Sequence, residues 1–134
     1  MIVSRVEADQ VRSLAGVIFE PDPGLTVIIG PNGAGKTNLV EAIYFGLTSR
    51  SFRTSDRRDL IPFGSAFARC RVTVQGGGVD HVFMASASRS EGNRFTMDGA
   101  RIEQAEAVLH RPKVTVFSPD RLELVKGPPA GRRA

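Results

Sequence analysis

The sequence predicts an α/β fold built around a phosphate-binding loop, and three adjacent features support this prediction. Residues 30–37 read Gly-Pro-Asn-Gly-Ala-Gly-Lys-Thr and match the P-loop pattern G-x-x-x-x-G-K-[ST]. The apolar, β-branched run at residues 25–29 precedes the loop and is typical of a buried parallel strand. Apolar residues then recur at helical spacing over residues 37–48. The pattern is informative only between a strand and a helix, and both are predicted here.

The residue types of this loop suit the binding of a nucleoside triphosphate. Glycines allow backbone angles closed to other residues and bring N–H groups close to phosphate oxygens, and the N-terminus of the next helix adds partial positive charge. Lys36 can reach the terminal phosphates, and the Thr37 hydroxyl can ligate Mg²⁺. We therefore expect ATP to contact Gly30, Pro31, Asn32, Gly33, Ala34, Gly35, Lys36 and Thr37. The alternative is a glycine-rich turn that caps a helix and binds nothing.

Before the loop, the pattern predicts strands over residues 1–8 and 17–20 with a turn at residues 10–15, and Pro21-Asp22-Pro23-Gly24 ends the second strand. In the helix after the loop we expect one apolar face, with Asn38 and Glu41 on the other side. That face consists of Leu39, Val40, Ile43, Tyr44 and Leu47.

Residues 49–63 form a basic segment that we expect to be flexible. It could contact DNA phosphates or the nucleotide, because arginines close to a nucleotide site attract phosphate. The candidate residues are Arg50, Arg53, Arg57 and Arg58. The alternative is a solvated loop whose arginines pair with Asp56 and Asp59.

The middle of the chain predicts an antiparallel meander beside the P-loop region. Alternation over residues 68–74, the three glycines at 76–78 and the run 79–87 indicate a hairpin, and Asp98-Gly99 between residues 94–97 and 100–102 indicates another. After it we expect a helix over residues 103–110, a strand over 114–117 lying next to residues 25–29 in one sheet, and a helix from Ser118 to Gly127. The predicted domain therefore covers residues 1–127, and residues 128–134 form an unstructured tail.

Hydrolysis of ATP needs a second acidic site besides the P-loop. No apolar run in this sequence ends directly in Asp or Asp-Glu, and the nearest, residues 114–117, is separated by Ser118 and Pro119 from Asp120. Asp120 is thus the one weak candidate for a catalytic acid. We expect the chain alone not to turn over ATP at a useful rate.

Composition is that of a globular domain, with 41% hydrophobic and 24% charged residues and a net charge of +4 that is compatible with nucleic acid. No apolar run approaches the ~20 residues of a membrane helix, and the N-terminus has no secretory layout. The one cysteine cannot form an internal disulfide. We expect a cytoplasmic protein that does not enter membranes.

The sequence of residues 30–38 resembles the P-loop sequence of ABC-type ATPases, including the SMC and recombination branches. Five segments in order resemble the RecF family of bacterial DNA repair proteins more specifically: residues 38–44, 50–54, 60–64, 116–120 and 124–127. The resemblance implies the N-terminal lobe of an ABC-type ATPase head, an incomplete part of such a head. It also implies that the family's helical arm, Leu-Ser-Gly-type signature and second acidic motif lie beyond residue 134.

That resemblance implies an ATP-dependent, DNA-binding protein of recombinational repair and replication-fork restart within the SOS response. In the family, two heads dimerise around ATP, bind duplex or gapped DNA, and help to load recombinase with a RecR-type mediator. By position, Asn38 joins the phosphate-binding residues, Arg12 lies near the nucleotide base, and residues 118–120 fall at the loop that senses the γ-phosphate.

The sequence departs from the family near its start, where Asp9-Gln10-Val11-Arg12 replaces Arg-Asn-Phe-Arg and puts the base contacts in question. Its tail also departs, with Pro-Ala-Gly-Arg-Arg where the family continues through an acid into the arm. Three alternatives stay open: the head of another SMC or recombination ATPase, a P-loop kinase or GTPase, and a non-catalytic remnant. A GTPase would predict an Asn-Lys-x-Asp motif and a kinase would predict a lid over the acceptor site, and the sequence has neither.

Overall fold

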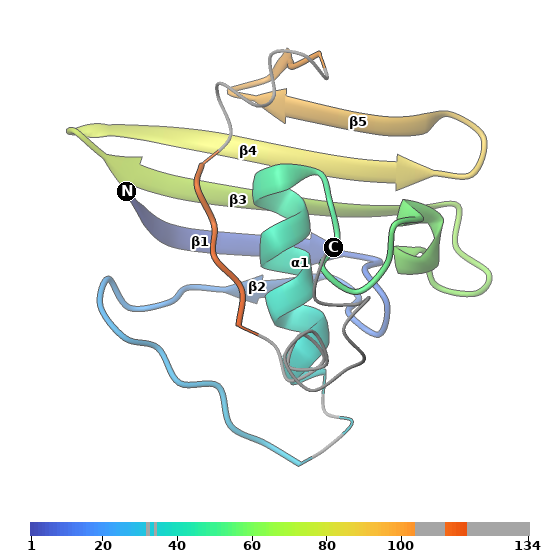
Figure 1. The fold of residues 1–134 in the computed structure, drawn as a ribbon, viewed down its shortest axis with the longest axis horizontal. Helices are drawn as coiled ribbons and strands as arrows, with labels where there is room; N and C mark the ends of the chain where they lie inside the picture. Colours follow the sequence, from blue (N-terminus) through green and yellow to red (C-terminus); the bar gives the residue numbers. More distant parts are fainter. Residues whose placement is uncertain (32, 34, 104–111, 118–134) are drawn as a thin grey trace, which may run out of the picture.

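The computed structural model describes residues 1–31, 33, 35–103 and 112–117. Its main element is a six-stranded antiparallel sheet with the strand order β2-β1-β3-β4-β5-β6. The helix α1 (Lys36–Thr48) runs across one face of this sheet, as Figure 1 shows, and the short 3-10 helix η1 (Arg57–Leu60) lies beside it. The strands are β1 (Ile2–Asp9), β2 (Val17–Phe19), β3 (Phe67–Gly76), β4 (Val79–Ser88), β5 (Gly92–Met97) and β6 (Ala100–Arg101).

The predicted meander is confirmed. Successive side chains of a strand point to opposite faces of the sheet, so alternating residues are buried and exposed. In β3, Cys70 and Val72 are buried against α1, whereas Arg69 and Arg71 are exposed on the other face. The neighbouring strand repeats the pattern, with Ala85 paired to Cys70 across the ladder. Burial and, as the smaller cause, the nearby Glu7 charge raise the pKa of the Cys70 thiol to about 12.

The predicted hairpin turns are also confirmed. Gly77 and Gly78 take positive φ angles of 62° and 78° between β3 and β4. Between β5 and β6, Asp98 has a φ of 52°, and its carboxylate accepts hydrogen bonds from Val82 N at 2.8 Å and from His81 Nδ1 at 2.7 Å. These bonds hold the pKa of Asp98 below its ordinary value, with the His81 bond as the larger cause.

The helix forms where the sequence predicts it, but the expected face is wrong in part. Val40 of that face is 40% exposed, and Glu41, expected on the other side, is fully buried. The reason is that α1 is covered on two sides. Gly46 packs so closely on the sheet that a Cβ there would lie 2.6 Å from Val72 Cγ2. On another side Phe52 of the basic segment makes an edge contact with Tyr44, with ring centroids 5.6 Å apart.

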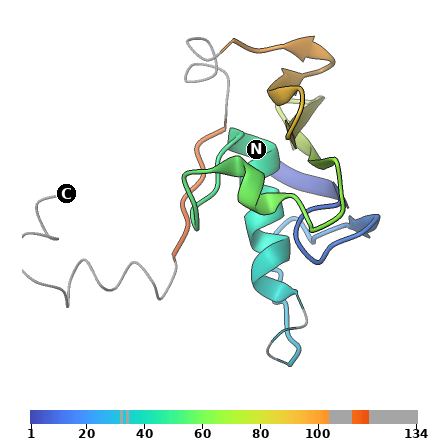
Figure 2. The same ribbon diagram turned by 90° about the vertical axis from the view of Figure 1, so that its right-hand side faces the viewer.

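Residues 25–29 and 114–117 do not form the strands that their composition predicts, and the expectation that they pair in one sheet is wrong for the described structure. Neither segment joins a ladder. Leu25, Val27 and Ile29 are 88%, 70% and 86% exposed, and Phe117 is 96% exposed. An extended segment becomes a strand only when another strand meets its N–H and C=O groups. Figure 2 shows the sheet on one side of α1 and residues 112–117 on the other.

Several predictions lie outside the described residues. They are the helix predicted over residues 103–110, of which only Glu103 is described, the helix at 118–127 with Asp120, the domain boundary at 127, the tail, and the positions of Asn32 and Ala34. Within the described ranges, the model contains no helix both long and apolar enough to span a membrane.

Candidate nucleotide site

The P-loop lies at the N-terminal end of α1, beyond the β2 edge of the sheet (Figure 1). Gly33 and Gly35 have φ angles of 88° and 91°, which residues with a side chain rarely adopt. These angles agree with the prediction that the glycines allow a backbone conformation closed to other residues. Gly35 is the N-cap of α1 and has no side chain to bond the first amides of the helix. Lys36 turns back over the loop, where its Nζ donates to Gly30 O. The Thr37 side chain is exposed at the same end.

The turn after β1 packs directly against this loop. Val11 and Leu14 exchange backbone hydrogen bonds of 3.0 and 2.9 Å and close the turn. A Cβ built on Gly35 would lie 3.4 Å from Ser13 Oγ. The same hydroxyl accepts a 2.7 Å hydrogen bond from Nδ2 of Asn38. The first turn of α1 is therefore held to the N-terminal turn by side chains directly beside the P-loop.

Behind Asn38, the buried carboxylate of Glu41 joins three segments of the chain. Arg12 reaches it from the N-terminal turn, with Nε at 2.5 Å from Oε1 and Nη2 at 3.3 Å from Oε2. Ser51 Oγ donates to Oε2 at 2.7 Å, and Arg53 Nη1 donates to Oε1 at 3.3 Å. Asn38 Oδ1 accepts a second bond from Arg53 Nη1 at 2.9 Å.

The polar side chains of the basic segment after α1 form hydrogen bonds with the segment's own backbone. Ser51 Oγ accepts from the backbone N–H groups of Arg53 and Thr54 at 3.0 and 3.3 Å. Asp56 caps η1 by accepting from Arg58 N at 3.0 Å. The segment is a folded turn that presents particular arginines rather than an adaptable basic tail.

The four candidate arginines of this segment have different surroundings. Arg53 is held by Glu41 and Asn38, and Arg58 pairs with Asp56 at 2.9 Å, as the alternative interpretation expected. Arg57 Nε donates to Ser49 O, and burial, followed by the charge of Arg50, lowers its pKa. Asp59 accepts from Thr54 Oγ1 at 2.6 Å.

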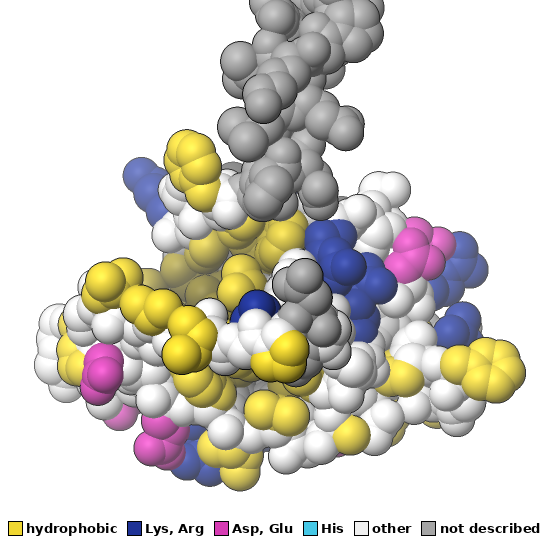
Figure 3. All heavy atoms as spheres, turned by 90° about the horizontal axis from the view of Figure 1, so that it is seen from below, with side chains coloured by type: hydrophobic (Ala, Val, Ile, Leu, Met, Phe, Trp, Pro, Cys, Tyr) yellow, Lys and Arg dark blue, Asp and Glu magenta, His cyan; other side chains and the backbone are white. Residues whose placement is uncertain are grey.

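Arg50 is exposed and lines a hollow of about 310 Å³ between the end of α1 and residues 112–115. Tyr44, Thr48 and Lys113 also line it. Figure 3, which views the molecule from the P-loop end, shows hydrophobic side chains gathered next to a group of Lys and Arg side chains. Arg53, Arg57 and Arg58 have side-chain partners within the described residues, and Arg50 is the one of the four for which these residues provide no side-chain hydrogen bond or ion pair.

Comparison with known proteins decides the family. The family model described as the RecF/RecN/SMC N terminal domain matches residues 2–117. The chain belongs to this family.

The curated relatives of this RecF/RecN/SMC-family chain include several proteins named "DNA replication and repair protein RecF". The one from Arthrobacter sp. (strain FB24) is 35% identical over 133 residues, which cover 99% of this chain and 33% of that protein. The one from Lacticaseibacillus casei (strain BL23) is 41% identical over 124 residues, covering 91% of this chain and 33% of that protein. The chain thus spans about a third of the length of these relatives.

Solved structures support the same family fold. A structure described as the recombination mediator protein RecF-ATP in the RecFOR pathway matches with a TM-score of 0.87 and 26% identity, over 98% of this chain and 36% of that one. A structure from work on ATP-driven dimerization and DNA-stimulated activation of SMC ATPases matches with a TM-score of 0.76 and 23% identity, over 99% of this chain and 96% of that one. The predicted fold class, an N-terminal lobe of an ABC-type ATPase head with an antiparallel meander, is confirmed.

In this family member, sequence reasoning missed the roles of Glu41, Ser51 and Ser13. A helix with one apolar stripe would leave Glu41 in water, so helical periodicity alone gave the wrong answer. A usable signal was present: an acid lies between two arginine-bearing segments in a chain with excess arginine. Arg12, expected near the nucleotide base, is found bonded to Glu41 beside the loop.

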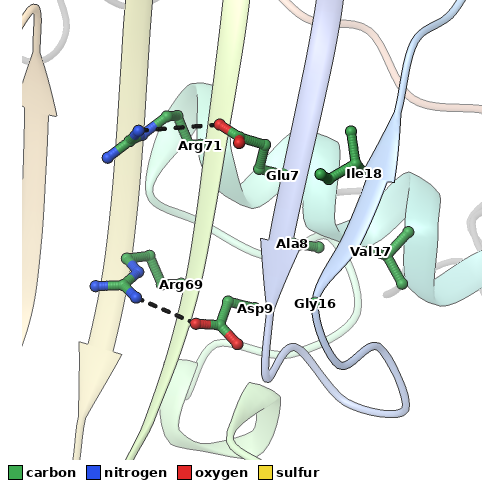
Figure 4. Close-up of a pocket in the computed structure, with 8 residues that line it drawn as sticks. All are labelled: Glu7, Ala8, Asp9, Gly16, Val17, Ile18, Arg69 and Arg71. Carbon is green, nitrogen blue, oxygen red and sulfur yellow. Dashed lines mark hydrogen bonds and ion pairs between the residues drawn. The ribbon is translucent and has the colours of Figure 1, made fainter.

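A second hollow, of about 420 Å³, lies on the sheet face opposite α1 (Figure 4). Its charged side chains form cross-strand pairs, with Arg69 Nη2 at 3.1 Å from Asp9 and Arg71 Nη1 at 3.9 Å from Glu7. These charges already have partners of opposite sign on the neighbouring strand. The hollow is therefore a weaker candidate for binding an ion than the P-loop end of the molecule.

Proposed function

We propose that this chain forms the ATP-binding part of a RecF-type ATPase acting in DNA repair and replication. The observation that carries the proposal is the P-loop geometry: two glycines at positive φ, an uncapped helix N-terminus, and Lys36 folded over the loop. Similar RecF proteins carry the name "DNA replication and repair protein RecF", and one similar structure is described as RecF-ATP. These names support the proposal for the parent protein of which this chain would be the first third.

In the proposed complex, the loop amides and the Lys36 ammonium bind the phosphates. The Thr37 hydroxyl, exposed at the start of α1 beside Lys36, would hold Mg²⁺. Arg12, on the turn that packs on Gly35, and Asn38, in the first turn of α1, flank the site. Mg²⁺ supplies charge neutralisation at the phosphates when it is bound.

The test is a calorimetric titration of ATP–Mg²⁺ into the 134-residue chain and its Lys36→Ala variant. Losing a charge-assisted contact of about 1.5–3 kcal/mol should weaken binding roughly 10- to 100-fold. Lys113→Ala, which removes the same charge away from the loop, serves as the control and should bind like the wild type. Equal affinity of wild type and Lys36→Ala would contradict the proposal.

The proposed parent also binds DNA, as a dimer that closes around ATP and with a RecR-type mediator as partner. Dimerisation driven by ATP is named for the similar SMC ATPases. For this chain, Arg50 is the proposed phosphate contact, since it is exposed at the basic segment while Arg53, Arg57 and Arg58 already have intramolecular partners.

Salt dependence tests the DNA contact. Each neutralised phosphate contributes about −0.9 to the slope of log K against log salt. Arg50→Gln should therefore make the slope shallower by about 0.9 for duplex DNA, measured by fluorescence anisotropy. Arg101→Gln, on β6, is the matched control and should leave the slope unchanged. If the two variants behave alike, Arg50 is a surface arginine without a role in DNA binding.

A further inference from the structure

We propose that Glu41 is a positioning residue of the nucleotide site, holding Arg12 and the turn that carries Arg53 in place beside the P-loop. The proposal rests on the proposed ATP site and adds a residue that does not itself touch the nucleotide. Glu41 would act through Arg12, whose guanidinium it orients, and through Ser51, whose hydroxyl it anchors.

The carboxylate of Glu41 is saturated with donors. Its two oxygens provide about four lone-pair sites, and four hydrogen bonds reach them. The side chain is 0% exposed, so each of these bonds replaces water that the carboxylate has lost. A buried charge persists only when partners of this kind compensate it, which ties the position of each partner to Glu41.

These partners converge on the end of the helix that carries the P-loop. Asn38 and Glu41 are three residues apart in α1 and share a face, and Arg53 Nη1 bonds both of them. Asn38 in turn bonds Ser13, which lies beside Gly35. The network therefore holds two guanidinium groups against the first turns of α1, the helix that follows the P-loop.

The charge balance points to a ligand rather than to stability alone. Two arginines share one carboxylate, which leaves one positive charge in excess at this place. The side chains of Arg12 and Arg53 are 26% and 33% exposed, so they reach solvent from a buried anchor. A guanidinium has five N–H donors; the bonds to Glu41 use two of them on Arg12, and the bonds to Glu41 and Asn38 use two on Arg53. The others can serve an anion such as a nucleoside triphosphate.

The direction in which Glu41→Gln changes the affinity for nucleotide separates this role from a simple charge effect. Glu41→Gln keeps the size of the side chain and removes its negative charge. If Glu41 acted only as a charge, its removal would strengthen the binding of an anionic nucleotide. If Glu41 positions Arg12, binding weakens, because the guanidinium loses its orientation.

The experiment is a double-mutant cycle in the 134-residue chain with ATP–Mg²⁺ as the ligand, using calorimetry on Glu41→Gln, Arg12→Gln and the double variant. We expect Glu41→Gln to weaken binding about tenfold and the double variant to bind no more weakly than the weaker single variant. Glu20→Gln, an exposed acid paired with Arg5 on the sheet, controls for charge and should not change the affinity. Unchanged or tighter binding by Glu41→Gln, or effects that multiply in the double variant, would overturn the proposal.

Arg12→Lys covers the case in which Glu41→Gln does not fold. It keeps the charge of Arg12 and removes the fork that bonds both carboxylate oxygens. We expect weaker ATP binding with a thermal midpoint close to the wild type. Wild-type affinity in Arg12→Lys would mean that charge alone suffices, and the positioning role would be refuted.

A second readout does not depend on ATP. The amides of Arg53 and Thr54 bond Ser51 Oγ, which Glu41 anchors, so they should exchange with deuterium faster in Glu41→Gln than in the wild type. Unchanged exchange there would refute the proposal whatever the nucleotide does. Failure of the wild type to bind ATP, with exchange accelerated as expected, would instead refute the proposed function and limit Glu41 to ordering this turn.

Discussion

The antiparallel sheet and the segment that leads into the P-loop were both predicted to form strands, and they differ in structure. The prediction rested on alternating apolar and polar residues in β3 and on a β-branched apolar run at residues 25–29. In β3, the apolar side chains are buried and every residue from Phe67 to Gly76 has a partner in β4. In residues 25–29, three apolar side chains are exposed and no ladder forms. Composition thus indicates a strand, but only a partner makes one.

The difference follows from where each partner is found. Antiparallel neighbours are joined by short turns, so β3 finds β4 across two residues, Gly77 and Gly78. A parallel strand needs a crossover connection and therefore a partner distant in sequence. The relatives of this chain are about three times as long. Within the described residues, β3 has such a local partner in β4 and a distant one in β1, whereas residues 25–29 join no ladder.

The largest expected effect contrasts two phenylalanines. Phe83 in β4 is 1% exposed and stacks near Phe95, while Phe117 is 96% exposed. Phe83→Ala should lower the free energy of unfolding by about 3–5 kcal/mol, and Phe117→Ala should change it by less than about 0.5 kcal/mol. Urea unfolding followed by circular dichroism measures both. A comparable loss in Phe117→Ala would show that residues 112–117 belong to the core.

A smaller effect is expected where α1 meets the sheet. Gly46→Ala would place a Cβ 2.6 Å from Val72 Cγ2 and 3.1 Å from Cys70 Sγ. Overpacking costs about 1–3 kcal/mol, and the better helix propensity of alanine returns up to about 1 kcal/mol. We expect a net loss of about 1–2 kcal/mol in thermal or urea unfolding.

Gly24→Ala is the matched control for that substitution, in the unpaired segment. A Cβ there meets no atom within 4 Å, and Gly24 does not have a positive φ. Its free energy of unfolding should stay within about 0.5 kcal/mol of the wild type. Equal losses at Gly46 and Gly24 would remove the distinction between the two regions.

The sequence predicted those parts of the molecule that are determined by nearby residues. Alternation in β3, the glycine turn, the run at residues 79–87 and the Asp98-Gly99 turn were enough for the meander, and the P-loop pattern was enough for the start of α1. The burial of Glu41 was missed because it depends on Arg12 and Ser51, which approach from two other segments.

The basic segment shows the same limit. Four arginines within nine positions indicated a contact with phosphate, but three of them have intramolecular partners that only the fold reveals. The Ser51 hydroxyl accepts hydrogen bonds from two backbone N–H groups of the turn, and the composition of the segment does not predict these bonds. The charge pattern therefore identified the basic segment but could not show which of its arginines is available to bind phosphate.

Hydrogen–deuterium exchange, followed amide by amide, tests the central claim that this chain folds on its antiparallel sheet while the segment before the P-loop stays unpaired. We expect the interior amides of β3 and β4 to exchange on the order of 10³-fold or more slowly than the free-peptide rate, because they open only with global unfolding. The amides of residues 25–29 should exchange close to the free-peptide rate. Protection of residues 25–29 equal to that of β3 would contradict the account, since it would require a paired strand where the structure has none.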